Sequence, residues 1–165
     1  MKSRSAFFVL VLLLLTVTVC AAQSPMGFSP DDFYLDFAVA NMYLGGPKYS
    51  FDIGNENDGA MISDGDSSYI YMSYSNNNVT ELSLLSMFDS DDDEATSRAI
   101  NLLAATLISL AYIAGEDADA FTTEQIRTII SSLVLETEAE YWGYQFTMGI
   151  LEEDNFALIA MTVTK

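Results

Sequence analysis

The acidic run from Asp89 to Glu94 is the stretch of this sequence whose residue types and spacing first suggest chemistry. Asp89, Asp91 and Asp93 match positions 1, 3 and 5 of an EF-hand calcium loop, where carboxylate oxygens bind the ion. The match ends there, because Glu94 replaces the glycine of position 6 and Ile100 replaces the bidentate glutamate of position 12. We therefore expect the run to form the charged N-terminal end of a helix, with weak binding of divalent cations as the alternative.

The residues that the chain lacks exclude several classes of catalytic and metal site. Histidine is absent and Cys20 is the one cysteine, which excludes Ser-His-Asp and Cys-His nucleophiles and the usual zinc and copper sites. A second acidic group, Glu116 to Asp119, is expected to face water in a loop. Paired carboxylates remain able to hydrolyse glycosidic bonds, but no spacing among the 24 acidic residues sets the separation or the raised pKa required. The sequence therefore predicts no catalytic, cofactor-binding or metal-ligating residues and no cofactor.

Aromatic residues on predicted strands are a further candidate for a binding surface: Tyr69, Tyr71, Tyr141, Trp142 and Tyr144. A row of rings on one face of a sheet can stack on sugars or peptides. Bulky rings more often fill a core and its cross-strand contacts, so we expect these to be core residues. Asn78-Val79-Thr80 matches the glycosylation pattern, which matters only in a host that glycosylates secreted chains.

The first 22 residues have the layout of a cleavable secretory signal peptide. Lys2 and Arg4 begin it, and the uncharged apolar run 6–19 follows. Small residues at 20–22 then predict cleavage after Ala21 or Ala22. We therefore expect a secreted or extracytoplasmic protein, in the periplasm or at the cell exterior.

Two alternatives to cleavage and release remain open. A retained membrane anchor is the first, but the apolar run is shorter than the roughly 20 residues that span a bilayer. Lipid attachment at Cys20 is the second, although Val19 stands where acylated cysteines usually have a small residue before them.

The remaining chain, 23–165, is long enough for one domain with its own core. Loss of residues 1–22 leaves four basic residues against 24 acidic ones, a net charge of −20 compared with −18 for the whole chain. Four basic side chains are too few to contact a row of phosphates, which excludes nucleic acid as a partner. An anionic membrane surface would repel the domain for the same reason. A basic protein or peptide is therefore the favoured partner.

Hydrophobic periodicity predicts three helices, over about 29–44, 95–114 and 122–135. Ser29 is a good N-cap before Pro30, and the stretch 102–114 is apolar nearly all round, as in a buried central helix. Alternating patterns predict the strands, over 49–53, 60–63, 69–74, 79–87, 141–150 and 156–164.

These elements predict an α+β fold: a single domain with an antiparallel sheet of about four to six strands packed against about three helices, in the order α-β-β-β(-β)-α-α-β-β. The order is similar to that of cystatin-like and secretion-chaperone-like sheets, but no residue motif accompanies it. We expect a secreted, non-enzymatic binding domain that recognises a protein or peptide of basic character. The alternatives are a small carboxylate-dependent hydrolase acting on extracellular carbohydrate, and a cell-surface or structural domain whose acidity serves solubility.

Overall fold

The computed structural model describes residues 24–54, 59–116 and 123–165. The predicted signal peptide lies outside the described residues, as do most of the turn after residue 54 and the acidic loop from Asp117. The predicted N-cap of the third helix, Thr122, is also outside them.

Seven antiparallel strands form one sheet in the order β1-β2-β3-β4-β7-β6-β5, which confirms the predicted α+β class. The C-terminal strand lies in the middle of the sheet, where Leu84 of β4 pairs with Met161 of β7. The strands are β1 (Ser50–Ile53), β2 (Ala60–Ser63), β3 (Ser68–Ser75), β4 (Asn78–Asp89), β5 (Glu138–Tyr141), β6 (Tyr144–Glu153) and β7 (Phe156–Thr164).

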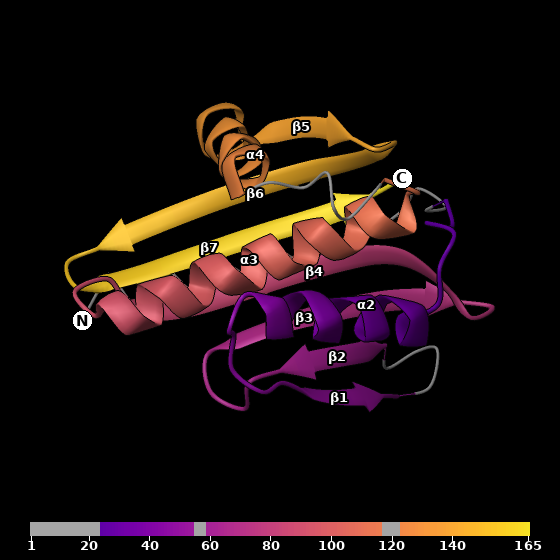
Figure 1. Cartoon of the computed structure of the whole chain (residues 1–165), viewed down its shortest axis with the longest axis horizontal. Helices are drawn as coiled ribbons and strands as arrows, with labels where there is room; N and C mark the ends of the chain where they lie inside the picture. Colours follow the sequence, from indigo (N-terminus) through magenta and orange to yellow (C-terminus); the bar gives the residue numbers. More distant parts are fainter. Residues whose placement is uncertain (1–23, 55–58, 117–122) are drawn as a thin grey trace, which may run out of the picture.

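Three described helices, α2 (Pro30–Tyr43), α3 (Asp93–Ile113) and α4 (Thr123–Glu136), lie on the same side of this sheet (Figure 1). The core fills the space between the two layers, and its largest fully buried side chains include Phe33, Phe37 and Phe146. The predicted start of α2 is confirmed, because the Ser29 hydroxyl accepts the Asp32 N–H and the Asp32 carboxylate accepts the Ser29 N–H.

The central helix α3 is buried over most of its length, as its sequence predicts. Its two buried polar side chains are satisfied within the helix: the Thr106 hydroxyl donates to the Leu102 carbonyl at 2.8 Å, and the Ser109 hydroxyl donates to the Ala105 carbonyl at 2.6 Å. Within the described part of the chain, α3 is the helix with the length and apolar composition of a membrane span, and here it packs against α2, α4 and β4.

The fold departs from the sequence prediction at Trp142. The alternating pattern of 141–150 predicts one strand, but the chain turns there, so that Tyr141 pairs with Tyr144 across a two-residue hairpin. Trp142 and Gly143 have φ values of 56° and 76°, the left-handed conformation that this kind of turn requires. The sheet therefore gains β5, which forms its second edge.

Candidate functional site

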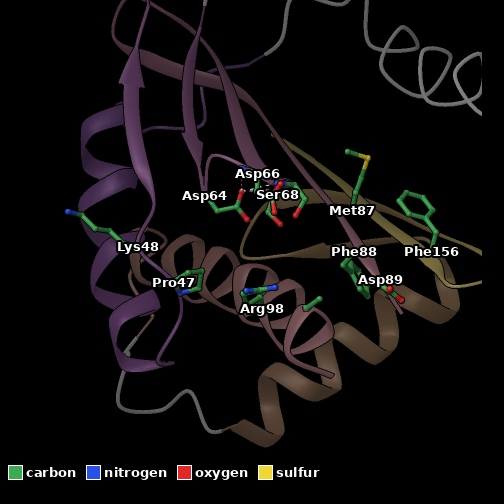
Figure 2. A pocket seen from close by; sticks show the side chains of 12 residues that line it. Pro47, Lys48, Asp64, Asp66, Ser68, Met87, Phe88, Asp89, Arg98 and Phe156 are labelled. Carbon is green, nitrogen blue, oxygen red and sulfur yellow. Dashed lines mark hydrogen bonds between the residues drawn. The ribbon is translucent and has the colours of Figure 1, made fainter. Parts of the chain in front are cut away.

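A cavity of about 560 Å³ opens at one end of the sheet (Figure 2). The β2–β3 turn, the end of β4 and the first turns of α3 supply most of its lining, together with the loop after α2. Ionisable, hydroxyl and apolar side chains from these segments all reach it. The cavity is therefore the first candidate for a ligand site.

The β2–β3 turn is shaped by the carboxylate of Asp64. Its Oδ1 atom accepts the backbone N–H groups of Asp66, Ser67 and Ser68 at 2.9, 3.1 and 3.1 Å. These three bonds give Asp64 a structural role, because they satisfy donors that the tight turn leaves without backbone partners. The same bonds hold the Asp66 side chain at the cavity.

Two serine hydroxyls are buried beneath this turn. Ser68 Oγ lies 2.7 Å from Ser86 Oγ on the neighbouring strand, and the two residues are 6% and 1% exposed. Ser68 also lines the cavity. The pair is satisfied internally.

Arg98 of α3 lies across the cavity from Asp64 and Asp66, while the side chain of Lys48 extends away from them (Figure 2). The guanidinium of Arg98 is 3.5 Å from the carboxylate of Glu94, one turn earlier in the helix. The cavity therefore has the Arg98 cation on one wall and the Asp64 and Asp66 carboxylates on another, and Lys48 and Asp89 also belong to its lining.

The buried phenol of Tyr49 lies close enough to both walls to be affected by their charges. Burial is the main cause that raises the pKa of Tyr49 to about 12, the negative charge of Asp64 adds to it, and the positive charge of Arg98 opposes it. Tyr49 is therefore a neutral hydroxyl near neutral pH.

The acidic run 89–94 caps a helix, as the sequence predicts. Asp92 is the N-cap of α3, and its Oδ1 accepts the N–H groups of Glu94 and Ala95. Asp89 Oδ1 accepts the N–H of Asp91 at 3.0 Å. Across residues 24–54, 59–116 and 123–165, no three Asp, Glu, Cys or His side chains gather as a metal site.

The aromatic residues singled out from the sequence are divided between the two faces of the sheet. Tyr144 is buried in the core, and Tyr141 and Trp142 pack against it beside Phe146. Tyr69 and Tyr71 alternate with core residues on β3 and so point away from the helices. The expectation that all five fill the core between helices and sheet is therefore wrong for these two tyrosines.

The solvent-facing side of α2 is a second candidate surface, which the sequence analysis did not identify. Leu35, Val39, Met42 and Tyr43 recur at i, i+4, i+7 and i+8, and they are 63, 52, 69 and 82% exposed. At 100° per residue they lie opposite the buried stripe that begins at Phe33. We call these four residues, with Asp31, Asp32 and Asp36, the outer face of α2.

The charged residues of α2 are all acidic: Asp31, Asp32 and Asp36. The helix contains no Lys or Arg. Partial burial raises the pKa of Asp36, and the negative charge of Asp32 one turn away raises it further. Hydrogen bonds from Ser29 lower the pKa of Asp32. Apolar side chains and unneutralised carboxylates thus share one helix surface.

Comparison with known proteins finds no matching family model, curated protein or solved structure. We therefore infer the function of the chain from the arrangement of its own residues.

Proposed function

We propose that this chain is a binding protein for a protein or peptide that presents basic residues beside apolar ones, and that the outer face of α2 is its docking surface. The observation that carries the proposal is the set of four exposed large apolar side chains on one face of a helix whose charged residues are all aspartates. Contiguous exposed apolar groups are uncommon on a protein that acts alone.

Charge determines which partner fits this surface. A second copy of the chain would bring another net charge of −18 and three further aspartates against those of the first copy. A cationic amphipathic helix instead places apolar side chains on Leu35, Val39 and Met42 and its ammonium groups beside Asp32 and Asp36. Such a partner relieves the repulsion between the two carboxylates.

The test uses a fluorescent 15-residue amphipathic helix of leucine and lysine, with a leucine and glutamate peptide as the charge control. Anisotropy titrations compare Leu35→Ser with Leu135→Ser, since both leucines are exposed helix residues and Leu135 lies on α4. Loss of one buried leucine from the complex weakens binding by about tenfold or more for Leu35→Ser, and Leu135→Ser leaves it unchanged.

The charge contribution is tested in the same assay. Asp36→Asn weakens binding, Asp91→Asn in the α3 cap region does not, and the apparent Kd rises steeply between low and high salt. Equal affinity for the lysine and glutamate peptides, or equal effects of Leu35→Ser and Leu135→Ser, would refute the assignment of α2.

A further inference from the structure

We propose that the cavity at the end of the sheet binds a small zwitterion of the amino-acid or dipeptide class, with the ligand carboxylate on Arg98 and its ammonium group at Asp64 and Asp66. This site lies apart from the outer face of α2 and does not depend on the function proposed for it.

The first support is the separation of charge across the cavity. Arg98 and the Asp64–Asp66 turn lie on opposite walls (Figure 2), and both charges act on the buried phenol of Tyr49. A ligand with one charge only would satisfy one wall and leave the other unmatched. A zwitterion meets both, and each charged hydrogen bond favours it over a neutral analogue.

The second support is that the charged groups on both walls are only partly used by contacts within the protein. Arg98 is 47% exposed at its side chain and pairs with Glu94, which is 83% exposed, so that the pair is weak and open to a competing carboxylate. Asp64 uses Oδ1 for the turn, and the turn is held by the backbone of Asp66, not by its carboxylate. A guanidinium also presents several donors, so Glu94 does not exhaust it.

The third support is the apolar part of the lining. Phe88, near the end of β4, lies on the same side of that strand as Arg98, and Pro47 and Ala95 add to the lining there. Met87 and Phe156 also contribute to the lining, but their side chains lie on the other side of β4 (Figure 2). Apolar walls with a few converging polar groups are the usual composition of a small-molecule site, and about 560 Å³ lies within the usual range of volumes. The proposed ligand therefore carries an apolar side chain as well as its two charged groups.

The test is calorimetric titration of the full chain with L-leucyl-L-leucine and its two capped forms. N-acetyl-leucyl-leucine lacks the ammonium group, and leucyl-leucine amide lacks the carboxylate. We expect the free dipeptide to bind about ten- to a hundredfold more tightly than either capped form, as loss of a charged hydrogen bond predicts. A free dipeptide that binds no better than both caps, or no detectable binding of it at millimolar concentration, would overturn the proposal.

Substitutions assign each end of the ligand. Arg98→Gln removes the preference for the free carboxylate, so that the dipeptide and its amide bind equally, and Asp66→Asn reduces the preference for the free ammonium group. Glu94→Gln frees the guanidinium and preserves or strengthens binding, which separates the role of Arg98 from the Arg98–Glu94 pair. Arg127→Gln, an exposed change on α4, controls for overall charge; if it weakens binding as much as Arg98→Gln, the cavity is not the site.

Discussion

The buried pair formed by Ser68 and Ser86 predicts an unequal response to removal of its two hydroxyls. Ser86 is 1% exposed and does not line the cavity, whereas Ser68 does. Ser68→Ala therefore leaves Ser86 with a buried hydroxyl that has lost its partner, at a cost of about 1–3 kcal/mol. After Ser86→Ala the remaining Ser68 hydroxyl can turn to solvent in the cavity, so the cost lies near the low end of that range.

The double variant sharpens this prediction. With both hydroxyls absent no buried donor is left without a partner, so Ser68→Ala with Ser86→Ala is expected to cost less than Ser68→Ala alone. The two single changes are therefore strongly non-additive. Urea unfolding followed by far-UV circular dichroism gives all three free energies, and Ser50→Ala, an exposed strand serine, is the control at less than about 0.5 kcal/mol.

Two results would refute this reasoning. Equal costs for Ser68→Ala and Ser86→Ala would show that the cavity does not solvate Ser68. A double variant that loses the sum of the two single effects would show that the hydroxyls act independently, against their separation of 2.7 Å.

Two further predictions concern the stability of helix α2 and of the hydrophobic core. Ser29→Ala removes the N-cap of α2, at a cost of about 1 kcal/mol of unfolding free energy near neutral pH. Because Ser29 lowers the pKa of Asp32 in the folded protein, its stabilising contribution is present above the ordinary carboxyl pKa and is lost as the pH falls through the lowered pKa. The stability difference from wild type should therefore shrink on acidification, and a difference that stays constant would contradict this reasoning. Phe146→Ala in the core beneath α4 is expected to lower the unfolding free energy by about 3–5 kcal/mol, measured by thermal or urea unfolding. A loss below about 1 kcal/mol would mean that neighbouring side chains move in to fill the space left by the ring.

Local signals explain why most elements could be predicted from the sequence. Ser29 and Pro30 define a helix start by chemistry that operates within one turn, and the structure places both in those roles. The hairpin at Trp142 could not be predicted, because the alternation of apolar residues continues through the turn and a bulky aromatic rarely adopts a positive φ. Non-local pairing, such as Leu84 with Met161, depends on the whole fold.

The residues of the outer face of α2 also follow a helical spacing in the sequence, but the buried stripe alone is enough to predict the helix. The spacing of Phe33 and Phe37 predicts a helix whose buried side contains both rings, as the structure shows. Leu35 and Val39 form a second apolar stripe, on the exposed side of the same helix. The cavity gave no such signal, because Asp64 and Arg98 are distant in sequence and are brought to one place by the β2–β3 turn and α3.

Net charge alone predicts a basic partner but not its position, because many carboxylates are already used within the fold. Asp64, Asp89 and Asp92 each accept backbone N–H groups in their own turn or helix cap, so their substitution should act first on stability. Asp31 and Asp36 lie on α2 among exposed apolar side chains, where a cation gains most from reaching them. Asp32 of the same helix differs from them, because its carboxylate already accepts the Ser29 N–H, so we expect Asp31 and Asp36 to contribute more than Asp32 to the proposed binding.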